Sequence, residues 1–572
     1  MKGLDGDYCH DVFPRESHPV TPDGPAVIKP GAGSREPGAG SREPGAGWRT
    51  LPTQRRVLVV VRTTTTLTRL LDVVSLIAAD RRIQVLFTVD EANGAFLAGG
   101  MRPVLQALDA VVVSWADATR TRFDLALAAS ENDDLSRLDA PVVLLPHGVG
   151  QQKYYPGTSI VSGLTPERVG ASPAVFALSH PDQVRRLAEL RPAAGQRARV
   201  VGDPALGRMV ASRHRASAYR AAFDARGRAL VVLASTWGPD SLLGEWPELP
   251  ERLLAELPAD EYRIVAALHP GIWAHGPWQV RAWWSRAAEY GLRIVPPEQG
   301  WQAALLGASC VLSDFGSLGL YAASLDKPLL LAPRPSATTV PGSAAAVLGQ
   351  HAPRLDRQAG LRGQVDATIA GHVPGRYDRV AALAVDAPGR SAPRLRSLLY
   401  ELMHLAEPAD IAEFPPVPMP ARVPGTATTV IVGAEASDAE VAVIRYPGID
   451  GHGARAGLDF RHLVADVDRA RLDQVGAAGI LRSGGGDPDD AAELLRQWPR
   501  AELIVAECGP DACRIWSRSA EMVVRAPLGR LGVDVTVLAS WAYVRLRRDG
   551  AVPDRDRLRL GGRVIEVAAE AG

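Results

Sequence analysis

Two histidines stand where a side chain could take part in a reaction. His147 closely follows the apolar run VVLL (142–145), and His269 directly follows RIVAAL (263–268). Imidazole titrates near neutral pH, so either residue could act as a general acid or base. A lone histidine beside Gly or Pro is most often a turn residue. Two at corresponding positions, one in each half of the chain, are less readily explained by chance.

A Ser-Asp-Phe-Gly-Ser turn supplies groups that could bind a phosphate or diphosphate. It runs from Ser313 to Ser317, between the run CVL and an apolar helix-like segment. Backbone N–H groups at the start of a helix attract anions, Gly316 permits close approach, and the two serines add donors. The charge of Asp314 would repel a phosphate. We therefore count Asp314 with this site as a helix cap that orients the turn.

Other small or polar residues also follow apolar runs. In an open parallel sheet, ligands bind outside the carboxyl ends of the strands. If two such sheets face each other across a cleft, residues that follow their strands converge there. The sequence thus predicts that the cleft is also lined by Gly148, Gly202, Asp203, Ser235, Thr236, Trp237 and Pro270.

Short apolar runs separated by helical segments set the expected fold. Residues 53–225 hold runs such as VLVVV (57–61) and AVVV (110–113), and the pattern restarts in 226–407 with ALVVLA (229–234). Continuous apolar runs of this length are typical of parallel strands covered on both faces. We predict an α/β fold with two doubly wound Rossmann-like domains that face a cleft.

The remaining segments complete the predicted organisation. Residues 1–52 carry a repeated PGAGSRE sequence, which is typical of a disordered tail. Residues 408–425 are a Pro-rich linker that should be semi-rigid. Residues 426–572 are predicted to form a small accessory α/β domain, with a strand expected at DVTVLASWAYVRL (534–546).

Composition narrows the class of protein. The 64 basic residues balance 64 acidic ones, and the absence of a long Lys/Arg block argues against a nucleic-acid partner. The four cysteines lack zinc-type or disulfide-framework spacing, which fits a reducing cytoplasm. No run approaches the ~20 apolar residues of a membrane span, so any membrane contact is expected to be peripheral, at the inner face.

Asp466 and Asp468 form the one acidic pair that we considered as a metal site. They follow an apolar run as a DxD sequence, and such a pair can hold a divalent cation on a diphosphate. We interpret the pair as a surface turn. Accordingly, neither a metal nor another cofactor is expected.

Five motifs, in their order along the chain, resemble those of the CDP-glycerol glycerophosphotransferases. They are PHGVGQQKY, VVGDPALGRM, VLASTWG, ALHPG and SDFGSLGLYAASLDKPLLL, and the resemblance covers roughly residues 55–400. This family has the GT-B fold and builds polymers of the teichoic acid type. The resemblance implies an acceptor-side domain at 53–225 and a nucleotide-donor domain at 226–407.

The resemblance also implies a reaction and residue roles. A polyol phosphate would pass from CDP-glycerol, or a similar CDP-polyol, to a polyol, glycan or glycolipid acceptor of the cell envelope. His147 would deprotonate the acceptor hydroxyl. His269 would hold the donor diphosphate and stabilise the departing nucleotide, together with Ser313, Gly316 and Ser317.

Departures from the family pattern keep two alternatives open. The turn at Ser235 reads Ser-Thr-Trp-Gly, where the family usually has an Arg, and Tyr321 replaces an acidic residue that is a candidate ribose contact. The first alternative is a GT-B glycosyltransferase that uses a UDP- or GDP-sugar. The second is a catalytically degenerate GT-B-like binding protein. A UDP-N-acetylglucosamine 2-epimerase is disfavoured, because SLGLYAASLDKP contains no Glu.

Overall fold

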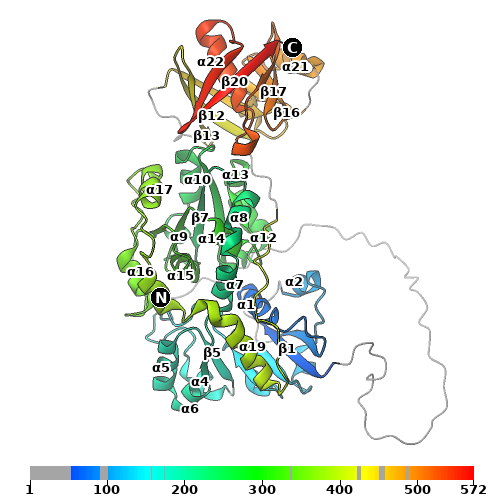
Figure 1. Cartoon of the computed structure of the whole chain (residues 1–572), viewed down its shortest axis with the longest axis vertical. Coiled ribbons are helices and arrows are strands. Elements are labelled where there is room, and N and C mark those ends of the chain that lie inside the picture. Colours follow the sequence, from blue (N-terminus) through cyan, green and yellow to red (C-terminus); the bar gives the residue numbers. More distant parts are fainter. Residues whose placement is uncertain are drawn as a thin grey trace, which may run out of the picture. The chain divides into compact units, whose positions relative to one another are not determined.

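The computed structural model describes most of the chain after the predicted tail. The described residues are 53–90, 101–155, 157–172, 174–334, 338–421, 427–449, 458–484 and 488–571. The tail predicted at 1–52 lies outside them. The described chain contains two lobes with parallel sheets, followed by a third domain (Figure 1).

The first lobe is a six-stranded parallel sheet in the order β2-β1-β3-β4-β5-β6. Its strands are β1 Arg55–Val61, β2 Ile83–Val89, β3 Leu125–Ala128, β4 Val142–Leu144, β5 Val175–Leu178 and β6 Ala198–Val200. Its helices are α1 Thr64–Val74, α2 Met101–Ala107, α3 Trp115–Ala118, η3 Leu135–Arg137, α4 Pro166–Ala171, α5 Pro181–Leu190, α6 Pro192–Gln196 and α7 Pro204–Ala211. Apolar clusters cover both faces of the sheet, as continuous apolar strands require.

One strand predicted in this lobe is not formed. The run at 110–113 makes only a single bridge, in which Phe87 N–H donates to Val111 O at 2.8 Å and Val113 N–H donates to Phe87 O at 2.8 Å. Val111 and Val112 are 54% and 37% exposed, so this run lies at the sheet edge and not in the core.

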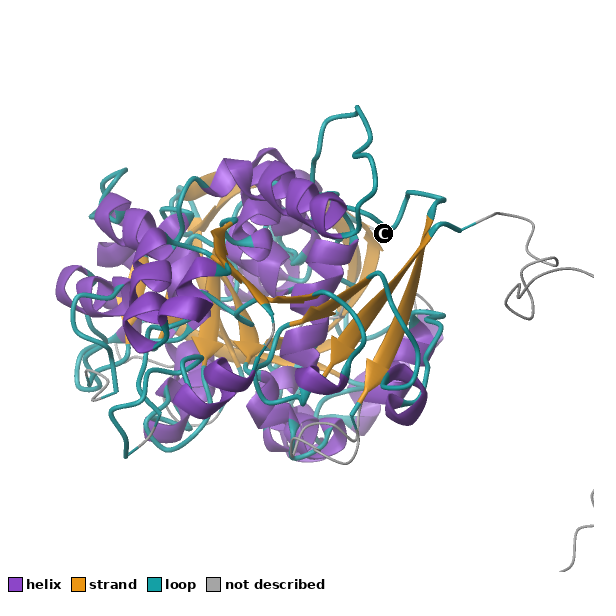
Figure 2. Cartoon of the chain, turned by 90° about the horizontal axis from the view of Figure 1, so that it is seen from below, coloured by secondary structure: helices purple, strands orange, loops and turns teal. Residues whose placement is uncertain are grey.

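The second lobe is a five-stranded parallel sheet in the order β11-β10-β7-β8-β9. Its strands are β7 Ala229–Ser235, β8 Tyr262–Leu268, β9 Arg293–Val295, β10 Cys310–Ser313 and β11 Leu329–Leu331. Its helices are η4 Arg213–Arg215, α8 Ala216–Ala222, α9 Leu242–Glu245, α10 Leu249–Glu256, α11 Pro270–Trp273, α12 Pro277–Trp283, α13 Ser285–Glu289, α14 Trp301–Gly307, α15 Ser317–Ser324, α16 Ala344–His351, α17 Leu361–Ala370 and α18 Asp378–Ala384. Together the two sheets confirm the predicted pair of Rossmann-like domains. In Figure 2, helices surround the strands of these sheets.

The chain returns to the first lobe after α18. The short η5 Pro388–Arg390 leads into α19 Ser391–Leu402, whose Leu395 and Leu399 are buried in the same apolar cluster as Val57 and Val59 of β1 (Figure 1). The predicted domain 226–407 includes this helix. It packs instead in the first lobe, because its apolar face completes that core.

The predicted linker is ordered where it is described. Phe414 is packed in the core of the first lobe and Val417 in that of the second. The Tyr219 hydroxyl donates to Val417 O at 2.7 Å. Residues 408–421 therefore run along both lobes before the third domain begins.

The third domain is a closed nine-stranded barrel, and the prediction of a small α/β domain was wrong in this respect. The strand order is β12-β13-β19-β20-β18-β17-β16-β15-β14. The strands are β12 Thr429–Ala436, β13 Val441–Pro447, β14 Phe460–Asp466, β15 Ile480–Arg482, β16 Leu503–Gly509, β17 Ala512–Trp516, β18 Glu521–Arg525, β19 Arg555–Leu560 and β20 Arg563–Ala571. The helices are α20 Leu472–Ala477, α21 Pro488–Gln497, η6 Gly529–Leu531 and α22 Val537–Asp549.

The segment predicted as a strand at 534–546 forms most of α22. Nine consecutive residues, Val537–Arg545, are buried, and the helix packs against β12, β13, β16 and β17. A helix buried on all sides shows no amphipathic period, so its apolar run could not be told from a buried strand.

The barrel attaches to the amino ends of the strands of the second lobe. Arg445 of β13 and Asp260, which precedes β8, form a buried ion pair with Nη2 to Oδ1 at 2.5 Å and Nε to Oδ2 at 2.7 Å. Ala259 N–H also donates to Arg445 O at 2.8 Å. The opposite, carboxyl edge of this sheet is the one that carries the predicted site.

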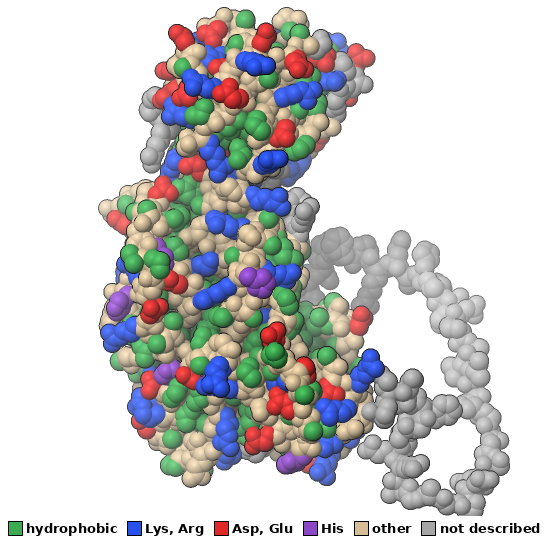
Figure 3. Space-filling view, in the orientation of Figure 1, with side chains coloured by type: hydrophobic (Ala, Val, Ile, Leu, Met, Phe, Trp, Pro, Cys, Tyr) green, Lys and Arg blue, Asp and Glu red, His purple; other side chains and the backbone are tan. Residues whose placement is uncertain are grey.

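The surface shows no single-sign patch on the face seen in Figure 3, where acidic and basic side chains are interspersed. Within the described ranges, no helix has the length and apolar character needed to cross a membrane.

Candidate functional site

The loops after β4 and β10 meet between the two lobes. His147 and Gly148 lie in the loop after β4, and Ser317 begins α15 after β10. A side chain at Gly148 would place its Cβ 2.4 Å from Ser317 Oγ. The two predicted elements, one from each lobe, are therefore in direct contact.

The two histidines also face the same region. Burial lowers the pKa of His269 to about 4, and the charges of His147 and Lys153 add to this effect. The pKa of His147 is lowered too, first by loss of hydration and then by Arg69. His147 is nevertheless exposed. A lowered pKa favours the neutral ring, which a general base or a neutral hydrogen-bond donor needs.

The orientation of His269 follows from a local hydrogen bond. Its Nδ1 accepts from Gly271 N–H at 2.9 Å and caps α11, while Pro270 occupies the first turn. The neutral ring therefore carries its proton on Nε2. Beside it, the Trp237 ring lies 6.4 Å away between centroids and is 64% exposed.

Asp314 organises the site without capping α15. Its Oδ2 accepts from the Thr236 N–H and hydroxyl, both at 2.7 Å, and from Leu242 N–H at 3.2 Å. Its Oδ1 accepts from Gly316 N–H at 3.0 Å. The N-cap of α15 is Gly316, which offers no side-chain bond, so the prediction of Asp314 as the helix cap was wrong. Its carboxylate instead ties the loop after β7 to the loop after β10.

Two serines predicted at the site are buried. Ser313 is 1% exposed, and its Oγ has no hydrogen-bond partner in the described part of the chain. A Cβ at Gly319 would lie 3.1 Å from that oxygen, so the hydroxyl faces the underside of α15 and not a ligand. Ser235 is 4% exposed, donates to Thr236 O at 3.0 Å and accepts from Leu243 N–H at 3.1 Å. Ser317 and the N–H groups at the start of α15, which no side chain caps, remain available to an anion.

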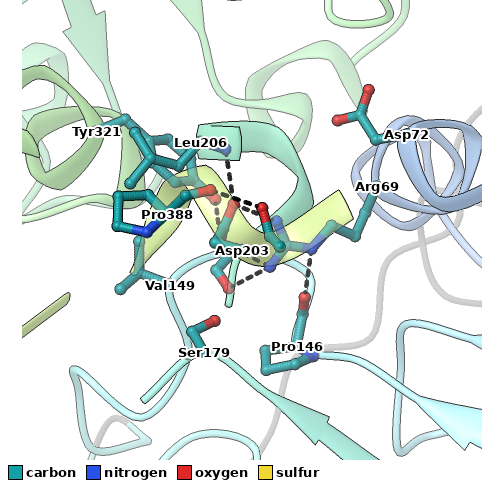
Figure 4. A network of polar contacts seen from close by, with 12 residues as sticks. Arg69, Asp72, Pro146, Val149, Ser179, Asp203, Leu206, Tyr321 and Pro388 are labelled. Atoms are coloured by element: carbon teal, nitrogen blue, oxygen red, sulfur yellow. Dashed lines mark hydrogen bonds and ion pairs between the residues drawn. The ribbon is translucent and has the colours of Figure 1, made fainter. Parts of the chain in front are cut away.

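Asp203 does not line the cleft, because its carboxylate is fully engaged inside the protein (Figure 4). It is 0% exposed and binds Arg69 through both oxygens at 2.7 Å. It also caps α7 by accepting from Leu206 N–H at 2.8 Å. The Tyr321 hydroxyl donates to it at 3.1 Å, and burial together with the Asp203 charge holds the pKa of Tyr321 well above its usual value.

This network holds the loop of the first histidine. Arg69 Nε donates to Pro146 O at 2.9 Å and Nη2 to Gly148 O at 3.2 Å, on either side of His147. Arg69 was not predicted as a site residue, and its signal in the sequence is a basic residue within the apolar helix TLTRLLDVV. Tyr321, which stands where the related family has an acid, is a second buried member of this network.

Gly202 also lies at the contact between the lobes. Its φ of +82° favours glycine, and a Cβ there would lie 3.0 Å from Ser391 Cβ. The position is buried against the start of α19, so the predicted cleft role of Gly202 was wrong.

Lys153 is a second residue that the sequence analysis left out, although the motif PHGVGQQKY contains it. Its segment crosses to the second lobe, where Tyr154 N–H donates to Thr338 O at 2.7 Å and Val340 N–H donates to Gln152 O at 3.0 Å. Burial lowers the pKa of Lys153, while Asp314 opposes this. The structure thus brings a lysine charge within electrostatic reach of both Asp314 and His269.

The predicted DxD pair forms a turn. Asp468 N–H donates to Asp466 Oδ1 at 3.1 Å, at the end of β14. Across the part of the chain that the structure describes, no group of three or more His, Cys, Asp or Glu residues could hold a metal ion.

The comparisons with known proteins found similar solved structures but no related sequence family. No family model and no curated protein matches the chain. Similar solved structures include the wall teichoic acid polymerase TagF, with 12% identity and a TM-score of 0.42 over 61% of this chain and 88% of that chain.

Two further structures were determined with a bound nucleotide. HepE of Anabaena, in complex with UDP and glucose, is 12% identical, with a TM-score of 0.37 over 61% of this chain and 100% of that chain. MnaA of S. aureus, with UDP, is 11% identical, with a TM-score of 0.41 over 62% and 100%. At these identities and TM-scores the likenesses say nothing about the reaction. The two-lobed fold rests on its own sheets and strand order.

Proposed function

We propose that the chain is a transferase that binds a nucleotide-activated donor between its two parallel-sheet lobes. The observation that carries the proposal is the meeting of His147 and Gly148 of one lobe with His269 and Ser317 of the other. A neutral base, an anion-binding helix start and a lysine charge come together there. Phosphoryl transfer relies on such positioning and electrostatics.

Each group has a task in this scheme. The diphosphate lies at the N-terminus of α15, where Ser317 and free N–H groups donate to it and Lys153 balances its charge. His269 donates from Nε2 to a phosphate oxygen. His147 takes the proton of the acceptor hydroxyl as the oxygen attacks phosphorus, and the bond to the nucleotide's bridging oxygen breaks.

The donor of choice is CDP-glycerol or a similar CDP-polyol, and this choice rests on the sequence motifs. Attack at the glycerol-bearing phosphorus joins glycerol phosphate to the acceptor and releases CMP. The acceptor is a polyol, glycan or glycolipid of the cell envelope, reached from the cytoplasm. A UDP- or GDP-sugar donor is the second candidate, since Tyr321 is bound to Asp203 and leaves no acid at the expected ribose position.

Release of the nucleotide tests the proposal. The full chain is incubated with CDP-glycerol and glycerol-phosphate or glycolipid acceptors, and CMP is measured. His147→Gln should abolish release, whereas His214→Gln, at an exposed histidine of η4, should not. Release of UDP or GDP from sugar donors would favour the second candidate. Binding of CDP without release from any donor would identify a degenerate binding protein and end the transferase proposal.

A further inference from the structure

A partly enclosed cavity lies where the barrel meets the second lobe, away from the proposed donor site. Its volume is about 40 Å³. On this measure one water needs roughly 10–15 Å³, so the cavity has room for a small ion but not for a nucleotide. Its charged lining consists of Arg228, Asp260, Arg263, Arg445 and Asp534.

Two of the arginines in this lining have buried nitrogens without an acceptor. Arg228 is 4% exposed, and its Nε and Nη1 have no hydrogen-bond partner among the described residues. Its remaining nitrogen, Nη2, donates to Gly532 O of the barrel. Arg263 of β8 has a buried Nε without a partner in the same part of the chain. Buried polar groups of native proteins nearly always find a partner, so these donors point to an occupant.

The two carboxylates of this lining already accept hydrogen bonds from other groups of the protein. Both oxygens of Asp260 accept from Arg445. Oδ1 of Asp534 accepts from the Thr536 N–H at 2.9 Å and from its hydroxyl at 2.7 Å. The lining therefore holds three arginine charges against two carboxylates.

The lowered pKa values of Arg228 and Arg263 are consistent with the excess of positive charge in the lining. Burial is the largest cause that lowers the pKa of both arginines, and Asp260 and Asp224 oppose the shift in each case. The pKa of Arg263 is lowered to about 9, with Arg228 and Arg293 adding repulsion. Because a guanidinium keeps its proton in a protein, an anion is the kind of acceptor that would also offset this charge.

We propose that this cavity binds one small inorganic anion of the phosphate, sulfate or chloride class, held by Arg228 and Arg263. The anion completes the contact between barrel and second lobe, because it neutralises the charge that the lobe presents to the barrel. The inference is independent of the transferase proposal.

Thermal unfolding of the full chain tests the site in solution. Phosphate, sulfate or chloride is titrated against gluconate at constant ionic strength, and at least one should raise the unfolding midpoint saturably. Arg228→Met and Arg263→Met should each remove the rise. Without anion, each variant should be no less stable than the wild type, because an unpaired buried charge has been removed.

A matched control separates this site from the donor site. Lys153→Met, between the lobes, should keep the rise. If Lys153→Met abolishes it and Arg228→Met keeps it, the anion binds between the lobes and the proposal is overturned. Equal responses of wild type and both arginine variants overturn it as well.

Crystals locate the anion without any variant. Crystals of the wild-type chain are soaked in sodium selenate and in sodium bromide, as probes for oxyanion and halide, and anomalous peaks are mapped. A peak within hydrogen-bond distance of Arg228 Nη1 or Arg263 Nε supports the proposal and tells oxyanion from halide. No peak in this cavity with either probe refutes it.

Discussion

Gly148 of the first lobe lies so close to Ser317 of the second that a Cβ at position 148 would stand 2.4 Å from the serine Oγ and 3.2 Å from its Cβ. Gly148→Ala must therefore displace Ser317 or separate the lobes. We expect a loss of stability of about 1–3 kcal/mol, as for other overpacked contacts, and weaker binding of CDP by calorimetry.

Two variants serve as controls for this contact. Gly363→Ala lies in α17, where an added Cβ meets nothing within 4 Å, and should leave binding unchanged. Ser317→Gly in the Gly148→Ala background should restore the spacing and recover part of the stability. Wild-type binding by Gly148→Ala alone would show that the loops are not in tight contact.

The hydroxyls of Ser313 and Ser317 should differ in their effects. Ser313→Ala removes a buried oxygen without a partner, so stability should stay the same or rise, and affinity for CDP should not change. Ser317→Ala removes a half-buried hydroxyl at the start of α15 and should weaken CDP binding several-fold. Equal losses from both variants would contradict the burial of Ser313.

Asp203→Asn should be strongly destabilising. The change leaves the buried Arg69 charge without its partner, and breaking such pairs costs about 3–5 kcal/mol. Urea unfolding measures the loss. As a control, Glu189→Gln breaks the exposed pair with Arg185 and should cost less than about 1 kcal/mol. A small effect of Asp203→Asn would mean that Arg69 finds water in place of the carboxylate.

Stability should depend on pH through His269. Its pKa falls from 6.5 to about 4 on folding, so the unfolded chain binds more protons between these values. The free energy of unfolding should therefore be fully retained above pH 6.5 and fall as pH drops toward 4. His269→Gln should make the decline shallower in denaturant titrations at several pH values.

An NMR titration of the imidazole provides the control for this pH effect. Lys153→Met removes one of the repelling charges and should raise the pKa of His269. Lys327→Met, whose ammonium donates to Leu306 O and Ala308 O, should leave it unchanged. An unchanged pKa of His269 in Lys153→Met would show that the lysine charge does not act on this imidazole.

Trp237→Ala should lower nucleotide affinity about ten-fold, because base stacking on an aromatic ring contributes about 1–3 kcal/mol. Trp237 is 64% exposed beside His269, which makes it available to a base. Trp278 of α12 is 77% exposed and provides the matched control. Equal affinities of the two variants for CDP would exclude stacking on Trp237.

The sheets of both lobes could be predicted because their signals are local. Runs such as ALVVLA (229–234) and RIVAAL (263–268) are apolar without a break and end at Ser, His or Gly, which marks both the strand and its carboxyl end. The meeting of His147 with the turn at Ser317 followed from that rule. The rule does not show which of the polar residues after a strand point into the protein interior.

The errors have a common physical origin in long-range packing. Asp203 and Ser313 have the residue types of a ligand site, but tertiary contacts bury them against Arg69 and α15. Residues 537–545 of α22 are buried on all sides because they pack against strands of the barrel. The helix α19 joins the core of β1, although Arg55 and Met403 at their ends lie 348 residues apart. Apart from α15, which closely follows Ser313, these partners are distant in sequence.

Two of the chain's passages between the lobes are adjacent, one at Gly202 and one where Asp386 leads to Ser391, and a third follows residues 408–421. Ser391 lies against Gly202, and Asp386 N–H donates to Ser179 O at 2.8 Å, so the two crossings are side by side. Loop residues at such passages are where a rotation of one lobe against the other would be absorbed. The barrel is joined to the second lobe through Arg445 and Asp260, so it would move with that lobe.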